Sequence, residues 1–132
     1  MANAVDTKHQ GVDRVICAWE LEPGVIVDPG PASALEGLLA GLRGEPRALL
    51  LTHIHLDHAG AAGVLARRYP GLRVYVHEVG APHVIDPSRL LSSARRLYGE
   101  AMDELWGEVA PVPAERVTAL RGGEEVEGCR VE

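Results

Sequence analysis

Apolar residues alternate between strand and helix spacing along this chain, in an order that is typical of an α/β fold. Two short strands are predicted at residues 15–21 and 24–27, joined by a proline–glycine turn. Residues 33–42 carry apolar side chains at helical spacing, with Ser33 as the expected N-cap. The continuous apolar run at 48–51 predicts a strand that is buried on both faces.

The second part of the chain continues this alternation. A helix is predicted over 60–69 and a strand over 72–76, so this strand and the preceding one form a βαβ unit and should run parallel. Residues 86–106 keep a helical apolar stripe, although Gly99 indicates a bend or two shorter helices. The tail predicts a β-hairpin or two edge strands, at residues 117–120 and 126–131.

Length and charge exclude several classes of protein. A chain of 132 residues is enough for one domain with a modest core. Its 19 acidic against 13 basic side chains give a net charge of −6, which disfavours a nucleic-acid surface. No apolar run is long enough to cross a bilayer, and residues 1–12 lack the pattern of a secretory signal. We therefore expect a cytoplasmic protein without nucleic-acid or membrane partners, whose Cys17 and Cys129 are free thiols.

A cluster of metal-binding residue types follows the predicted strand at 48–51. Three imidazoles and one carboxylate, in the pattern His53-x-His55-x-Asp57-His58, make a ligand set that suits zinc, iron or manganese. Alternate residues of an extended segment point the same way, so His53 and His55 can share one ion while Asp57 and His58 face a second. Four fixed positions disfavour the alternative of a polar loop that is rich in histidine by chance.

The segment Thr52-His53-Ile54-His55-Leu56-Asp57-His58 resembles the H-x-H-x-D-H signature of the metallo-β-lactamase-fold superfamily, and residues 74–90 resemble its glyoxalase-II-like branch. This resemblance implies an αββα sandwich, with residues 1–132 as the N-terminal part of a single domain. It also implies two divalent metal ions, zinc or alternatively iron or manganese. His53 and His55 would bind the first ion, and Asp57 and His58 the second.

The resemblance further implies an activity, in which a metal-bound hydroxide attacks a small-molecule thioester, lactone or related carbonyl compound. Asp57 is then the catalytic residue that orients the water and takes its proton. Asp28 resembles the Asp of the family's D-x-G turn, which supports the metal ligands from outside; the alternative is an Asp-Pro turn without a metal role. His77 either lines the pocket or is a hydrogen-bonded structural residue, and His9 is expected to be solvated.

The resemblance covers only the first half of the family domain, because no histidine follows His83 and the later metal ligands are absent. We therefore expect this chain to be part of a longer protein whose second half is needed for full activity. Two other functions share the same opening motif. One is a mononuclear iron persulfide dioxygenase, and the other is a non-catalytic metal-binding half-domain that associates with a partner chain, such as a second copy of itself.

The apolar stripe at the end of the long predicted helix allows three interpretations. It is formed by Leu97, Met102, Leu105 and Trp106. The first interpretation is a dimer interface. The second is that the helix covers the pocket with Tyr98 and Trp106. The third is the buried face of a plain core helix.

Overall fold

The computed structural model describes residues 2–132, which are organised around a six-stranded sheet. The first three strands of the sheet pair antiparallel, whereas the third to the sixth pair in parallel. The spatial order follows the sequence, as β1 (Asn3–Asp6), β2 (Cys17–Glu20), β3 (Val25–Val27), β4 (Ala48–Leu50), β5 (Arg73–His77) and β6 (Val117–Leu120). A separate antiparallel pair ends the chain, β7 (Glu125–Val126) and β8 (Cys129–Arg130).

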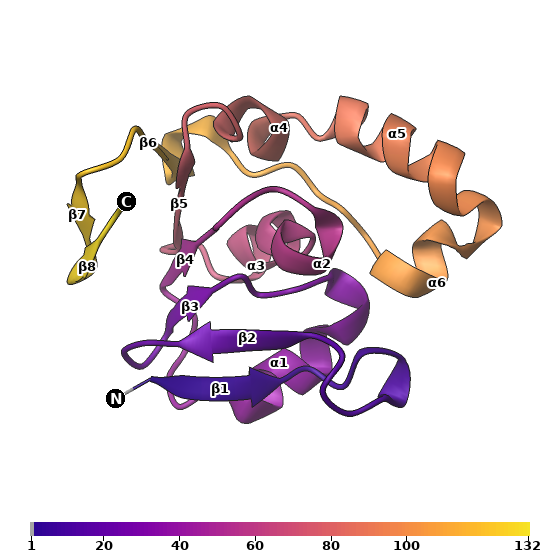
Figure 1. Cartoon of the computed structure of the whole chain (residues 1–132), viewed down its shortest axis with the longest axis horizontal. Coiled ribbons are helices and arrows are strands. Elements are labelled where there is room, and N and C mark those ends of the chain that lie inside the picture. Colours follow the sequence, from indigo (N-terminus) through magenta and orange to yellow (C-terminus); the bar gives the residue numbers. More distant parts are fainter. Residues whose placement is uncertain (1) are drawn as a thin grey trace.

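The first three helices lie on one side of this sheet, and the β7–β8 pair lies on the other side (Figure 1). These helices are α1 (Leu35–Gly41), α2 (Leu56–Ala59) and α3 (Ala62–Arg68). The chain between β5 and β6 forms an arm that extends beyond the sheet, made of α4 (Ala81–Ile85), α5 (Ser88–Tyr98) and α6 (Met102–Trp106). Short 3-10 turns complete the fold, at His9–Gly11, Ala32–Ala34, Gly99–Ala101 and Ala114–Arg116.

The two faces of the sheet differ in burial. Ile26, Leu49 and Val74 are register partners on the helix-covered face, and each is fully buried in the main core with Leu38 of α1 and Leu65 of α3. Burial of such side chains is the main source of stability in a domain of this size. The matching row on the opposite face is formed by Trp19, Val27, Leu50 and Tyr75. Trp19 is exposed, and the other three are only partly buried.

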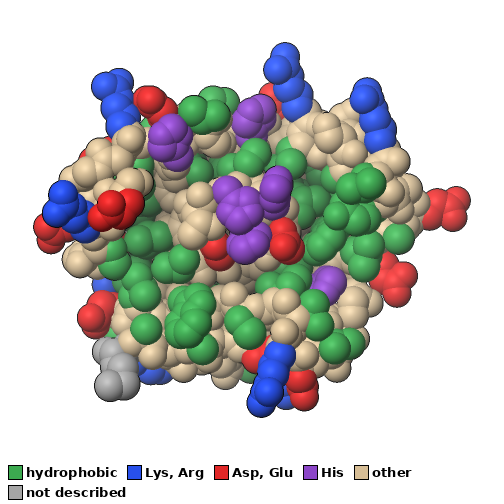
Figure 2. Space-filling view, viewed as in Figure 1, with side chains coloured by type: hydrophobic (Ala, Val, Ile, Leu, Met, Phe, Trp, Pro, Cys, Tyr) green, Lys and Arg blue, Asp and Glu red, His purple; other side chains and the backbone are tan. Residues whose placement is uncertain are grey.

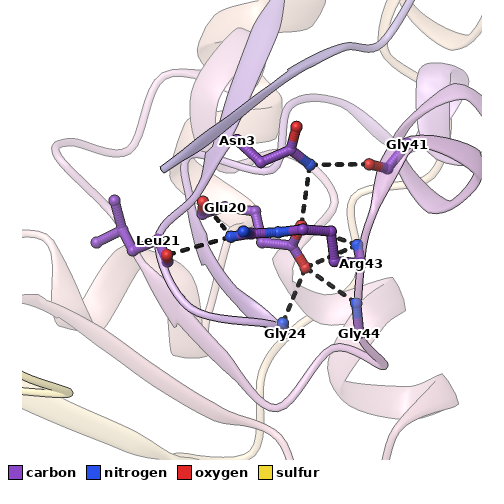
Figure 3. A network of polar contacts seen from close by, with 7 residues as sticks. All are labelled: Asn3, Glu20, Leu21, Gly24, Gly41, Arg43 and Gly44. Carbon is purple, nitrogen blue, oxygen red and sulfur yellow. Dashed lines mark hydrogen bonds and ion pairs between the residues drawn. The ribbon is translucent and has the colours of Figure 1, made fainter. Parts of the chain in front are cut away.

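A buried carboxylate ties the β2–β3 turn to the loop before β4. Glu20 is fully buried, and its side chain accepts hydrogen bonds from the backbone N–H groups of Gly24, Arg43 and Gly44 and from Asn3 Nδ2 (Figure 3). Burial by itself raises the pKa of Glu20, but these hydrogen bonds outweigh it and lower the pKa to about 2. Glu20 is therefore charged at neutral pH and fixes both loops.

The expected α/β class is confirmed, and so is the parallel pairing of β4 and β5. The break at Gly99 is also confirmed, because its φ of 55° lies in the left-handed region and separates α5 from α6. Cys17 and Cys129 are free thiols. None of the helices within residues 2–132 has the length and apolar character needed to span a membrane. The cytoplasmic location stays a prediction.

The local structure differs from the sequence-based expectations at three places. Of the two interpretations of the tail, Val117–Leu120 is an edge strand and not part of a terminal hairpin, because it pairs in parallel with β5 at the edge of the six-stranded sheet. The strand Asn3–Asp6 was not predicted, since its pattern is short and polar and it is held by pairing with β2. Ser33 does not cap α1; its Oγ donates a hydrogen bond to Leu105 O at 2.6 Å. Each difference concerns a contact between residues that are far apart in sequence.

Candidate metal centre

The parallel strands bring three polar segments to one edge of the sheet. Asp28 follows β3, the histidine motif follows β4, and His77 ends β5. The carboxyl ends of parallel strands are the usual position for functional loops in α/β folds. A backbone hydrogen bond joins the first two segments, because Asp28 N donates to Leu50 O, at the end of β4, at 3.1 Å.

Three side chains converge at this edge. One ligand atom each from Asp28, His53 and His58 lies within 4.8 Å of the others. The ring of His53 also contacts that of His55, with 4.8 Å between the ring centroids. Asp57 Oδ2 lies 3.4 Å from His58 Nε2. All four residues of the motif therefore lie together, and Figure 2 shows histidine side chains gathered at the centre of this face beside acidic side chains.

A hydrogen-bonded chain orients two of the imidazoles. Asp28 Oδ2 accepts from Thr52 Oγ1 at 2.6 Å and lies 2.9 Å from His58 Nδ1. Thr52 Oγ1 also lies 2.9 Å from His53 Nδ1. A carboxylate only accepts hydrogen bonds, so His58 Nδ1 is the donor to Asp28. The Thr52 hydroxyl already donates its one proton to Asp28, so in the contact with His53 it accepts and His53 Nδ1 donates. In the neutral form of each imidazole, Nε2 is then the nitrogen without a proton, which is the form that binds a metal.

Asp28 is suited to supporting the histidines. Its other oxygen, Oδ1, accepts from Thr52 N at 2.8 Å, so both carboxylate oxygens already have partners in the protein. Its φ of 50° lies in the left-handed region, which costs free energy for a residue with a side chain and is typical of functional turns. These contacts agree with the supporting role of Asp28, which stays a prediction. Thr52, which sequence reasoning did not single out, completes this arrangement.

Two glycines allow close packing, at different places. A Cβ on Gly60 would lie 2.6 Å from Leu56 O and 3.3 Å from Pro31 Cα, so Gly60 lets the helical segment after the motif pack against the turn at residues 28–31. Gly63 has a different neighbour. A Cβ on Gly63 would lie 1.8 Å from Ala110 O, so this glycine admits the segment that returns from α6 to β6.

His77 lies outside the group of three. Its side chain is exposed, and its Nδ1 accepts a hydrogen bond from Val79 N at 3.1 Å. It lines a groove of about 410 Å³ over the partly buried sheet face, together with Thr52, Leu50 and Tyr75. The hydrogen bond agrees with a structural role, and a role for His77 in the pocket stays a prediction.

The expectation that His9 is solvated was wrong. His9 is buried, and its ring stacks on Trp106 with 5.5 Å between centroids and an angle of 15° between planes. Its Nε2 contacts Leu105 O at the end of α6. This contact spans 96 residues of sequence, so nothing local to His9 could have indicated it.

An α/β sheet with a His/Asp cluster at the carboxyl edge of its parallel strands defines the class of this protein. The model of the metallo-beta-lactamase superfamily matches residues 21–131. The chain belongs to this superfamily, whose members bind divalent metal ions.

Relatives with curated names match part of the chain. A hydroxyacylglutathione hydrolase from Hamiltonella defensa is 51% identical over 51 residues, which are 39% of this chain and 20% of that protein. Another, from Serratia proteamaculans, is 40% identical over 65 residues, which are 46% of this chain and 26% of that protein. The chain therefore matches well under two thirds of the length of these relatives.

Solved structures extend the similarity to most of the chain. An archaeal superfamily protein from Sulfolobus tokodaii has a TM-score of 0.62 at 19% identity, over 86% of this chain and 45% of that chain. A protein solved in a di-iron-bound form has a TM-score of 0.58 at 33% identity, over 83% of this chain and 51% of that chain. The fold of this chain is thus that of about half of each solved structure.

Proposed function

We propose that this site takes part in the metal-dependent hydrolysis of a thioester, a lactone or a related carbonyl compound. The observation that carries the proposal is the hydrogen-bonded chain from Asp28 through Thr52, which leaves Nε2 of His53 and His58 free to bind a metal. The names of the curated relatives support a thioester as the substrate, because hydroxyacylglutathione hydrolases cleave a bond of that type.

The residues present fit a divalent ion. Imidazole nitrogens and a carboxylate are suitable ligands for zinc, and also for iron or manganese. In the proposed arrangement His53 and His55 hold one ion, and Asp57 and His58 hold a second. A bound divalent ion would supply a water of lowered pKa and would polarise the carbonyl group.

Hydrolysis then requires a base at the same place. The oxygen of water bonds to the acyl carbon, the bond to the leaving sulfur or oxygen breaks, and one water proton is carried to that leaving group. Asp57 is the proposed proton carrier, because its side chain is about half exposed (45%) and its Oδ2 lies beside His58 Nε2. Asp28 keeps the imidazole of His58 in place during this transfer.

Zinc titration of the metal-free protein tests the proposal. We expect His53→Ala and His58→Ala to weaken zinc binding at least about tenfold, because each removes a ligand. His83→Ala is the matched control, since His83 lies outside the cluster. Thioester hydrolysis by the zinc-loaded chain is measured in parallel. Equal zinc affinity in all four proteins would contradict the metal centre, and zinc binding without turnover would contradict hydrolysis by this chain alone.

Metal analysis and an oxygen-uptake assay with a persulfide separate the two alternative functions. An iron persulfide dioxygenase would retain iron and consume oxygen when a persulfide is added, whereas a hydrolase would not. A non-catalytic half-domain would bind metal without either reaction. The homodimer stays a prediction, and sedimentation of the protein over a range of concentrations checks it.

A further inference from the structure

A cleft of about 470 Å³ adjoins the metal centre. His55 and Asp57 line one end of it, and α5 and α6 supply most of the remaining wall. This volume is within the range of about 300–1,000 Å³ that is typical of small-molecule sites. Hydrophobic side chains lie directly beside the histidine cluster on this face of the molecule (Figure 2).

The wall of the cleft is apolar and partly aromatic. It includes Leu90, Ala94, Leu97, Tyr98 and Trp106. Leu97 is 75% exposed although it is large and apolar. Within the described residues, 2–132, no lysine or arginine lines the cleft; outside the metal motif, the lining residues with polar groups are Ser93, Tyr98 and Trp106. Such a wall has no lysine or arginine to pair with an anionic ligand, and its mainly hydrocarbon surface favours burial of apolar groups.

Contacts from distant segments hold this wall in place. The ring of Trp106 lies between the stacked ring of His9 and the edge of Tyr98, whose centroid is 5.3 Å away at 72°. Gln10 Nε2 donates to Glu104 O at 2.7 Å, and Ser33 Oγ donates to Leu105 O. The end of α6 is therefore fixed to the N-terminal part of the chain, so the cleft is formed before a ligand binds. Pre-formed apolar pockets with a polar end are typical ligand sites.

We propose that this cleft binds the acyl group of the substrate, and that this group is an apolar hydrocarbon chain. The inference rests on the proposed function, because the carbonyl carbon of the substrate would lie at the end marked by His55 and Asp57. A thioester, ester or lactone of a medium-chain fatty acid has the required form, with one polar end and one hydrocarbon end. Substrates with a charged or strongly polar acyl group are disfavoured by the same wall.

Chain length should therefore set affinity. Full burial of one CH₂ group strengthens binding about fourfold. Because the cleft is open to solvent at Leu97, we expect about half of that free energy, which corresponds to roughly twofold for each added CH₂.

Binding of straight-chain carboxylates tests this inference without turnover. The chain has two tryptophans, so Trp19→Phe leaves Trp106 as the one tryptophan, whose emission reports on the cleft. Acetate, butanoate, hexanoate and octanoate are titrated into this protein in its metal-free and zinc-loaded forms. We expect saturable changes in Trp106 emission, with a dissociation constant that falls by roughly fourfold for each two CH₂ groups.

A pair of surface variants tests the location. Leu97→Asp places a carboxylate in the wall and should weaken hexanoate binding at least about tenfold. Val79→Asp is the matched control, because Val79 is a similarly exposed apolar residue (72%) that does not line the cleft. Circular dichroism checks that both variants are folded.

The outcomes distinguish this inference from the proposed function. A chain-length series that is lost in Leu97→Asp and kept in Val79→Asp supports the cleft, even if zinc does not bind and the hydrolase proposal fails. Affinities that do not depend on chain length, or an equal loss of affinity in both variants, overturn the proposed role of the cleft. Neither result bears on the metal centre, which the zinc titration tests separately.

Discussion

His58 Nδ1 lies 2.9 Å from Asp28 Oδ2, and this contact joins two segments that are 30 residues apart in sequence. The contact fixes the tautomer of an imidazole whose other nitrogen faces Asp57. Thr52 extends the same arrangement to His53. The orientation of two metal-binding histidines therefore depends on one carboxylate that the turn after β3 supplies.

The first prediction concerns this carboxylate. Asp28→Asn keeps the shape of the side chain but replaces one acceptor oxygen by a donor, so the contacts with Thr52 and His58 cannot all be kept. We expect zinc affinity to fall by about 10- to 100-fold, as is usual when a partner of a metal-bound histidine is lost. Competition with a chromophoric chelator measures the affinity. Asp13→Asn, at an exposed acid, is the control, and unchanged zinc affinity in Asp28→Asn would count against the supporting role.

The second prediction concerns the hydroxyl group of Thr52. Thr52→Val removes the group that links Asp28 to His53, whereas Thr52→Ser retains it. We expect the valine variant to bind zinc about tenfold more weakly and the serine variant to bind nearly as the unaltered protein does. The cobalt-substituted proteins report the same change, because the visible absorption of cobalt depends on the geometry of its ligands. Equal losses in both variants would indicate a packing role for Thr52.

The third prediction follows from the buried carboxylate of Glu20 (Figure 3). Glu20→Gln turns an amide NH₂ group toward backbone N–H donors, so we expect a loss of about 3 kcal/mol in the free energy of unfolding. Urea denaturation at pH 7 measures it. Glu22→Gln, at an exposed neighbour, is expected to change the free energy of unfolding by less than about 0.5 kcal/mol.

The fourth prediction gives the pH dependence of the same group. The folded-state pKa of Glu20 is lowered to about 2 from an ordinary value of 4.5, so the folded protein binds this proton less readily than the unfolded chain does. Its contribution to stability is therefore complete above pH 4.5 and is lost as the pH falls from 4.5 toward 2. Across this window the unaltered protein should lose more stability than Glu20→Gln. Parallel pH curves for the two proteins would contradict the assignment.

The fifth prediction concerns the close contact at Gly63. A Cβ at this position would overlap Ala110 O, which is backbone and cannot move aside alone. We expect Gly63→Ala to lower the melting temperature markedly, with a loss of about 1–3 kcal/mol. Gly71→Ala is the matched control, because no atom lies within 4 Å of its added Cβ. It should be neutral or slightly stabilising.

The amino-acid sequence by itself determined the metal motif, the α/β class and the parallel β4–β5 pair. These features depend on local patterns: the spacing of His53, His55, Asp57 and His58, and runs of apolar residues bounded by turns. The break at Gly99 belongs with them, because glycine is favoured where φ is positive.

The tertiary structure alone decided how these parts are held. The hydrogen bond from Thr52 to Asp28, the stacking of His9 on Trp106 and the parallel pairing of β6 with β5 all join residues that are far apart in sequence. The cleft beside His55 has the same origin, because its wall comes from α5 and α6. Local patterns fix backbone preference and ligand type, whereas side-chain orientation and pocket shape follow from packing between distant segments.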